Sequence, residues 1–93
     1  MASLKELNEN TMVVTSTYIV NDGMPILYVS NEDDEEEGVI WQFHCGNGDY
    51  NMERMLLVKL ETILNLDSEL INLDLKIGQE AFRENKKAFW KIK

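Results

Sequence analysis

The only histidine and the only cysteine of this 93-residue chain are neighbours, His44 and Cys45, in the stretch "GVIWQFHCGNGDY" (residues 38–50). A cysteine nucleophile needs a base within hydrogen-bonding distance of its sulfur, and His44 is the one histidine that could serve. The stretch has the pattern of a strand, however, and successive strand residues point to opposite faces of a sheet. We therefore predict a buried Cys45, a half-exposed His44 on the other face, and no catalytic residues.

The residue types that bind metals and phosphates are also poorly placed. A structural zinc site needs four nitrogen or sulfur ligands, and the chain offers two such residues. Asp33, Glu35, Glu37 and Gly38 match positions 1, 3, 5 and 6 of a calcium-binding EF-hand loop, but position 12 is His44 where a glutamate is required. The "GNGDY" turn lacks the lysine of a phosphate-binding loop. We expect neither a metal nor a cofactor.

Acidic side chains dominate the first half of the chain. The formal net charge is -8, and residues 1–53 hold eleven of the seventeen acids and one of the nine bases. Such a surface repels nucleic-acid phosphates and attracts a basic protein partner. The candidate partner-binding residues are Glu32, Asp33, Asp34, Glu35, Glu36, Glu37 and Asp49. The alternative is that the run of six acids is a loop that only keeps the protein soluble.

Length and hydropathy favour one small domain, residues 1–93, in which residues 1–10 are loosely ordered. The first ten residues contain no apolar run typical of a secretory signal. The longest apolar stretch, "MPILYV", is far shorter than the roughly 20 residues that span a membrane. A single cysteine fits a reducing compartment. We expect a cytoplasmic protein without membrane contact.

Strand patterns fill the first half. Residues 12–20 and 25–30 are rich in β-branched and apolar side chains, which predicts a hairpin turned at Asp22-Gly23, with Pro25 opening its second strand. The acidic run then forms a loop before a third strand. On that strand we assign Val39, Trp41, Phe43 and Cys45 to the core face, and Ile40, Gln42 and His44 to the other face.

The second half changes period. "MLLVKL" predicts a fourth strand that runs into a helix from Leu60, and Asp67 is placed to cap a second helical turn. A last hairpin turns about Asn85. Large aromatic side chains should fill the core of so small a protein, namely Trp41, Phe43, Phe82, Phe89 and Trp90. The fold class is therefore α+β: a mainly antiparallel sheet of about five to six strands with one or two short helices packed on one face.

Three segments carry a family resemblance: "PILYVSNEDDEEEGVIWQFHCG", "VKLETILNLDSELINLDLKIG" and "EAFRE". They place a strand ending in Tyr28-Val29 before the acidic run, then a tryptophan-led strand, a Leu-rich segment and a late Gly78. The pattern resembles a family of small bacterial domains classed as immunity protein thirty-three of polymorphic toxin systems. The resemblance covers about residues 13–84. It implies a toxin-neutralising binding protein and brings no catalytic residues.

Two functions of different class follow. The first is an intracellular immunity-like protein that occludes a cognate, basic bacterial toxin, partly through its acidic surface. The second is a small regulatory or structural domain that self-associates, for example as a homodimer, through a sheet edge or an apolar patch. An enzyme is the third reading, and the sequence offers it no activated nucleophile or acid–base pair.

Overall fold

The computed structural model describes residues 4, 7–36, 38–49 and 51–93. Among these residues, six strands form one sheet in the order β4-β1-β3-β2-β5-β6. The strands are β1 (Met12–Ser16), β2 (Tyr28–Asp34), β3 (Gly38–His44), β4 (Met55–Lys59), β5 (Glu80–Phe82) and β6 (Lys91–Ile92). The helical elements are α1 (Thr17–Val20), α2 (Leu60–Leu66) and the 3-10 turns η2 (Met52–Arg54) and η3 (Ser68–Asn72).

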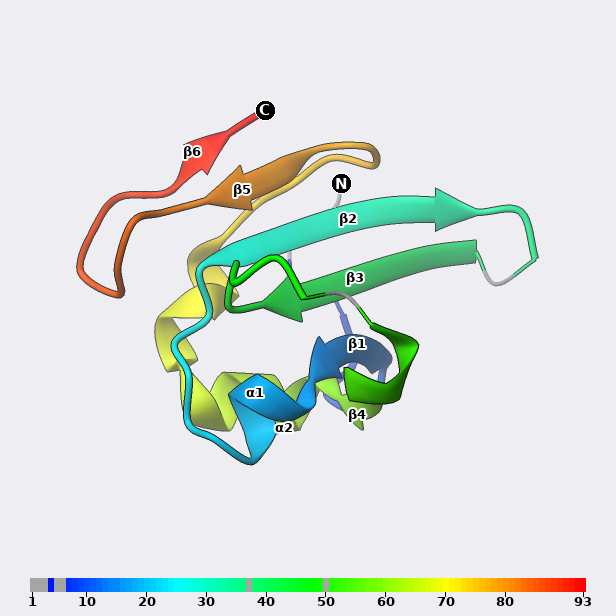
Figure 1. The fold of residues 1–93 in the computed structure, drawn as a ribbon. Coiled ribbons are helices and arrows are strands. Elements are labelled where there is room, and N and C mark those ends of the chain that lie inside the picture. The colour runs from blue at the N-terminus through cyan, green and yellow to red at the C-terminus, as the bar shows by residue number, and fades with distance from the viewer. Residues whose placement is uncertain (1–3, 5–6, 37, 50) are drawn as a thin grey trace.

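The sheet is mixed but mostly antiparallel. β1 pairs in parallel with β3, with Val14 opposite Gln42, while the β1–β4, β2–β3, β2–β5 and β5–β6 pairs are antiparallel. Helices α1 and α2 lie on one side of the sheet (Figure 1). The predicted α+β class is confirmed.

Strand alternation builds the core on the helical side of the sheet. Val13, Val29, Trp41, Phe43 and Ala81 occupy alternate positions of their strands, and each is at most 2 % exposed. The opposite wall comes from the helical segments, through Ile19, Leu60, Ile63 and Leu70, and from Leu73 and Leu75 in the chain after η3. Burying these apolar side chains supplies most of the free energy of folding, at about 25 cal/mol per Å² removed from water.

The predicted hairpin at Asp22-Gly23 is wrong, because β3 lies between β1 and β2. β1 ends at Ser16, and the chain turns into α1, which buries Ile19 at 1 % exposure. Residues 17–20 are β-branched or aromatic at every position, yet packing overrides that preference here. Pro25 lies in the connection before β2 and does not open a strand.

The acidic run is not a loop as predicted. Glu32, Asp33 and Asp34 belong to β2, whose seven residues pair with β3 as far as Asp34 opposite Gly38. Glu35 and Glu36 form the turn, and the prediction for Glu37 lies outside the described residues. Backbone pairing along β3 fixes the conformation, so acidic residues with low intrinsic β-propensity are accommodated at this solvent-facing end.

The predicted faces of β3 are correct for most positions. Trp41, Phe43 and Cys45 are buried, but Val39 is 49 % exposed because this end of the strand extends beyond the helices. His44 was expected to be half-exposed, and that is wrong: it is 3 % exposed. The other face of the sheet is thus covered at the His44 end.

The second half follows the predicted order of strand, helix, helical turn and final hairpin. Asp67 precedes η3 as expected, but its side chain makes no capping hydrogen bond. The prediction of a loose N-terminal segment falls partly on residues 1–3 and 5–6, outside the described residues. Within that segment Leu4 is fully buried and belongs to the core.

Candidate functional site

His44 is the last residue of β3, and Cys45, directly after the strand, belongs to the hydrophobic core cluster, which does not include His44. Nε2 of His44 lies 2.9 Å from Oε1 of Gln42, whose Nε2 donates to Glu32 Oε2 at 2.7 Å. A carboxylate can only accept hydrogen bonds, so the amide N–H of Gln42 points to Glu32 and its carbonyl oxygen faces His44. The Nε2 atom of His44 must therefore donate, which places the proton of the neutral imidazole on Nε2. The ring of His44 also stacks on that of Tyr28, its cross-strand partner, at 6.2 Å between centroids. Cys45 is buried at 6 % exposure.

These contacts form a polar row on the face of the sheet opposite the helices. Tyr28 extends it by donating to Glu80 Oε2 at 2.5 Å, so the row crosses β3, β2 and β5. Burial lowers the pKa of His44 from its usual value. The row depends on which strands are neighbours and on their register, so the local sequence pattern gave no signal for it. It supplies a hydrogen-bond partner for the buried His44 ring.

Five of the predicted partner-binding residues are carried by one structure, which we call the acidic hairpin: β2, β3 and their turn. Asp33 is exposed and lies opposite the half-exposed Val39, while Glu35 and Glu36 are exposed at the turn. β5 pairs only with residues 28–30 of β2, so the end of the hairpin projects beyond it (Figure 1). Asp34 is held by its pairing with Gly38.

Asp49 lies apart from the acidic hairpin turn. Its Oδ2 accepts from the hydroxyl of Tyr18 at 2.6 Å, and its Oδ1 accepts from the backbone N–H of Asn51 at 3.1 Å. The Tyr18 hydroxyl, followed by the Asn51 N–H, lowers the pKa of Asp49, and the same bond raises the pKa of Tyr18. Tyr18 follows the end of β1, which runs parallel to β3, so Asp49 sits at the His44 end of the sheet. Through these two hydrogen bonds the carboxylate of Asp49 orders the loop that follows β3.

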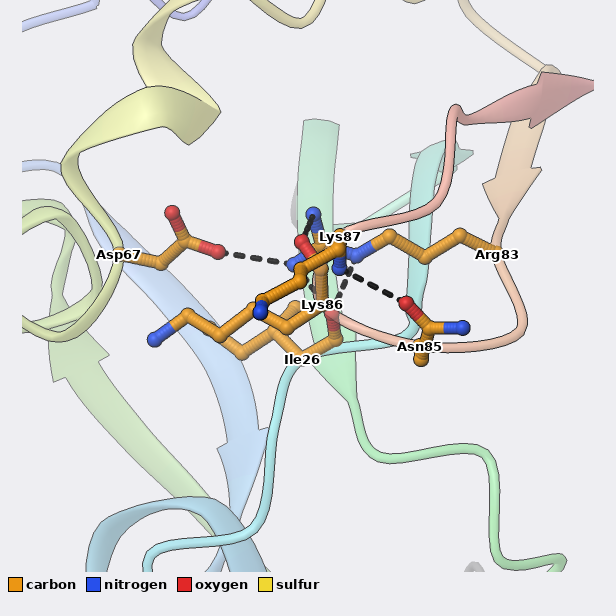
Figure 2. A network of polar contacts seen from close by, with 6 residues as sticks. All are labelled: Ile26, Asp67, Arg83, Asn85, Lys86 and Lys87. Carbon is orange, nitrogen blue, oxygen red and sulfur yellow. Dashed lines mark hydrogen bonds and ion pairs between the residues drawn. The ribbon is translucent and has the colours of Figure 1, made fainter.

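A buried ion pair organises the opposite hairpin, which we call the basic hairpin: β5, β6 and their connection (residues 80–93). Figure 2 shows Arg83 pointing inward from this hairpin. Its Nη2 donates to Asp67 Oδ2 and to the carbonyl of Ile26, both at 2.8 Å, and its Nη1 donates to the carbonyl of Lys86 at 3.1 Å. The side chains of Arg83 and Asp67 are 5 % and 8 % exposed. The pair ties the end of α2, the chain before β2 and the basic hairpin together.

The outer surface of the basic hairpin is cationic and carries an exposed aromatic ring. Phe89 is 94 % exposed, so its predicted place in the core is wrong. Trp90 packs over the guanidinium of Arg83 at 4.3 Å and is half-buried, which leaves Phe89, next to it, on the outside. The exposed lysines are Lys86, Lys87, Lys91 and Lys93. In the sequence these lysines flank Phe89 on both sides, and this pattern could have indicated that Phe89 lies on the surface.

A depression beside the ion pair is too small to suggest a ligand site. It has a volume of about 120 Å³ and is lined in part by Ile19, Pro25, Leu66, Asp67 and Lys86. Pockets for small molecules usually enclose about 300 to 1,000 Å³. Within the described residues no cluster of three histidine, cysteine or carboxylate side chains could hold a metal ion.

No helix in the described part of the chain has the length and apolar character needed to cross a membrane. Comparison of the sequence and the fold with protein families, curated proteins and solved structures gave no match. The candidate binding surfaces among the described residues are the acidic hairpin and the basic hairpin.

Proposed function

We propose that this chain is a protein-binding domain that covers a basic surface of a partner through its acidic hairpin. The partner class that fits the sequence resemblance is a basic bacterial toxin, which the domain would neutralise by occlusion. The main support for this proposal is that the acidic run is part of a paired, projecting hairpin, with exposed side chains at Asp33, Glu35 and Glu36.

Such a hairpin suits recognition better than a flexible acidic loop. Pairing between β2 and β3 fixes the backbone that carries the carboxylates before binding, so less conformational entropy is lost on association. The concentrated negative charge accelerates encounter with a basic surface and disfavours acidic competitors. Val39, half-exposed beside Asp33, adds an apolar contact at the same surface. The proposal rests on this hairpin and not on Asp49, whose carboxylate already accepts two internal hydrogen bonds.

The proposal assigns no catalytic step to the domain. The one histidine is 3 % exposed and the one cysteine is 6 % exposed, so both reactive side chains lie beneath the surface. Occlusion needs only affinity and a fast association rate, and both can come from the hairpin.

The test begins with the protein partner that co-purifies from the native host. We expect that changing Asp33, Asp34, Glu35, Glu36 and Glu37 to the corresponding amides slows association and flattens its dependence on salt. The matched control neutralises five acids that are exposed outside the acidic hairpin, namely Glu9, Asp22, Glu61, Glu69 and Asp74. The control variant should keep the native association rate to within about twofold. Equal rates and equal salt slopes for the native and hairpin variants would refute the proposal.

A further inference from the structure

The basic hairpin is a second surface with the properties of a binding site. Phe89 is 94 % exposed, although burying a phenylalanine side chain is worth about 1.5 to 3 kcal/mol. The exposed lysines Lys86, Lys87, Lys91 and Lys93 share this hairpin with the exposed Glu84. In a chain of net charge -8, this hairpin thus carries four exposed lysines and an unburied aromatic ring.

The connection that presents Phe89 is held by specific contacts. Arg83 binds the Lys86 carbonyl, the backbone N–H of Lys87 donates to Asn85 Oδ1 at 2.9 Å, and the backbone N–H of Ala88 donates to the Asn85 carbonyl at 3.1 Å. Figure 2 shows Asn85, Lys86 and Lys87 beside the buried Arg83. A turn that is fixed before binding loses little entropy on association. The exposed ring is therefore presented on a preformed support.

The acidic hairpin offers the complementary surface. It combines exposed carboxylates, Asp33 and Glu35, with the half-exposed apolar Val39. β5 runs antiparallel to β2, so the chain leaves β5 at the end of the sheet where β2 begins, and the acidic turn lies at the other end. Figure 1 shows the two connections at opposite sides of the molecule. One copy cannot bring them together, but two copies can.

We propose that this protein self-associates head to tail, with the basic hairpin of one copy docked on the acidic hairpin of the next. Phe89 packs against Val39, and the lysines face Asp33 and Glu35. The two surfaces differ, so the contact is heterologous and each added copy leaves one free surface at each end. The interface is small, and weak encounters bury less than about 1,200 Å², so we expect a dissociation constant on the order of 0.1 to 1 mM.

This inference goes beyond the proposed function, although both use the acidic hairpin. A basic partner bound to the hairpin would compete with the next copy of the chain. Self-association can be measured with the purified protein alone, so its failure is distinguishable from failure of partner binding.

The experiment is sedimentation velocity of the purified protein up to about 1 mM, at roughly 20 and 300 mM salt, since ionic contacts weaken with screening. One variant loses the basic surface by Phe89→Ser, Lys86→Glu and Lys87→Glu. The other loses the acidic surface by Asp33→Asn, Glu35→Gln and Val39→Ser. We expect the native protein to associate about tenfold or more weakly at the higher salt. Each variant alone should be monomeric, with the circular dichroism of the native protein.

Mixing the two variants gives the decisive result. Each keeps the surface that the other has lost, so the mixture should form a dimer that grows no further. A control with Ile77→Ser and Glu69→Gln, exposed positions outside both hairpins, should associate like the native protein. The proposal is overturned if the native protein stays monomeric, or if both variants still associate regardless of salt, as expected for pairing through the edge strand β4. Binding of the monomeric native protein to phosphatidylserine vesicles, lost with the basic surface, would reassign that surface to membranes.

Discussion

Removing one partner of the buried pair of Arg83 and Asp67 should destabilise the fold strongly, because it leaves the other charge buried without its partner. Arg83→Met keeps much of the apolar stem but removes the guanidinium, which leaves the Asp67 carboxylate 8 % exposed without its partner. Breaking one side of a buried pair typically costs about 3 to 5 kcal/mol. The carbonyls of Ile26 and Lys86 lose their side-chain donor as well. We therefore expect a loss of about 4 kcal/mol, out of a total of about 5 to 15 kcal/mol for a domain of this size.

Asp67→Asn should cost less, about 1 to 3 kcal/mol. Arg83 then keeps the Ile26 and Lys86 carbonyls and its contact with Trp90. In the double variant no unpaired carboxylate remains, so its loss should be smaller than the sum of the two single losses by about 1 to 3 kcal/mol.

The assay is urea unfolding followed by tryptophan fluorescence and circular dichroism at the same temperature for all variants. Lys76→Met serves as the control, because Lys76 is exposed and its replacement should change the free energy of unfolding by less than about 0.5 kcal/mol. The reasoning fails if Arg83→Met costs no more than Lys76→Met, or if the two single losses simply add.

Two further predictions concern β3. Trp41 is 2 % exposed and stacks near Phe43 at 6.3 Å between ring centroids, so Trp41→Ala should lower the free energy of unfolding by about 3 to 5 kcal/mol. Val39→Ala on the same strand should cost under about 1 kcal/mol, and equal thermal melting of the Trp41 variant and the native protein would place Trp41 outside the core. The second prediction concerns the pH dependence of stability. Burial lowers the pKa of His44 in the folded state, so as pH falls below the ordinary histidine value of about 6.5 the imidazole becomes protonated in the unfolded chain first. Stability should therefore decrease from pH 7.5 to 5.5, and the decrease should be smaller in His44→Gln; identical pH dependence of the two urea midpoints would contradict this.

Local patterns predicted the elements whose environment is set by nearby residues. The alternation of β3 placed Trp41 and Phe43 in the core, and the change of period at Leu60 marked the passage from β4 to α2. Both signals arise from side chains that face one core along a short stretch of chain.

Features that depend on distant segments were not predicted. The sequence could not show that β3 separates β1 from β2, because strand order depends on long-range pairing. Nor could it show that Asp67 would bind Arg83, 16 residues away, in place of capping η3. For Phe89, the expectation that every aromatic ring fills the core outweighed the evidence of the neighbouring lysines, and the ring is exposed. The acidic candidates lie at two ends of the sheet because β3 runs from the acidic turn to the end where Tyr18 binds Asp49.

The position of β1 in the sheet has a consequence for biosynthesis. β1 is an interior strand, but both of its neighbours, β3 and β4, come from residues 38–59 and are synthesised later. The β2–β3 hairpin needs only a short turn and can pair earlier, because closing a short loop costs less entropy. Residues 10–21 carry no charge and are rich in β-branched side chains, a composition that favours aggregation while unpaired. During synthesis this aggregation-prone segment therefore stays unpaired until β3 and β4 have emerged, and a chaperone that covers it over that interval would protect the nascent chain.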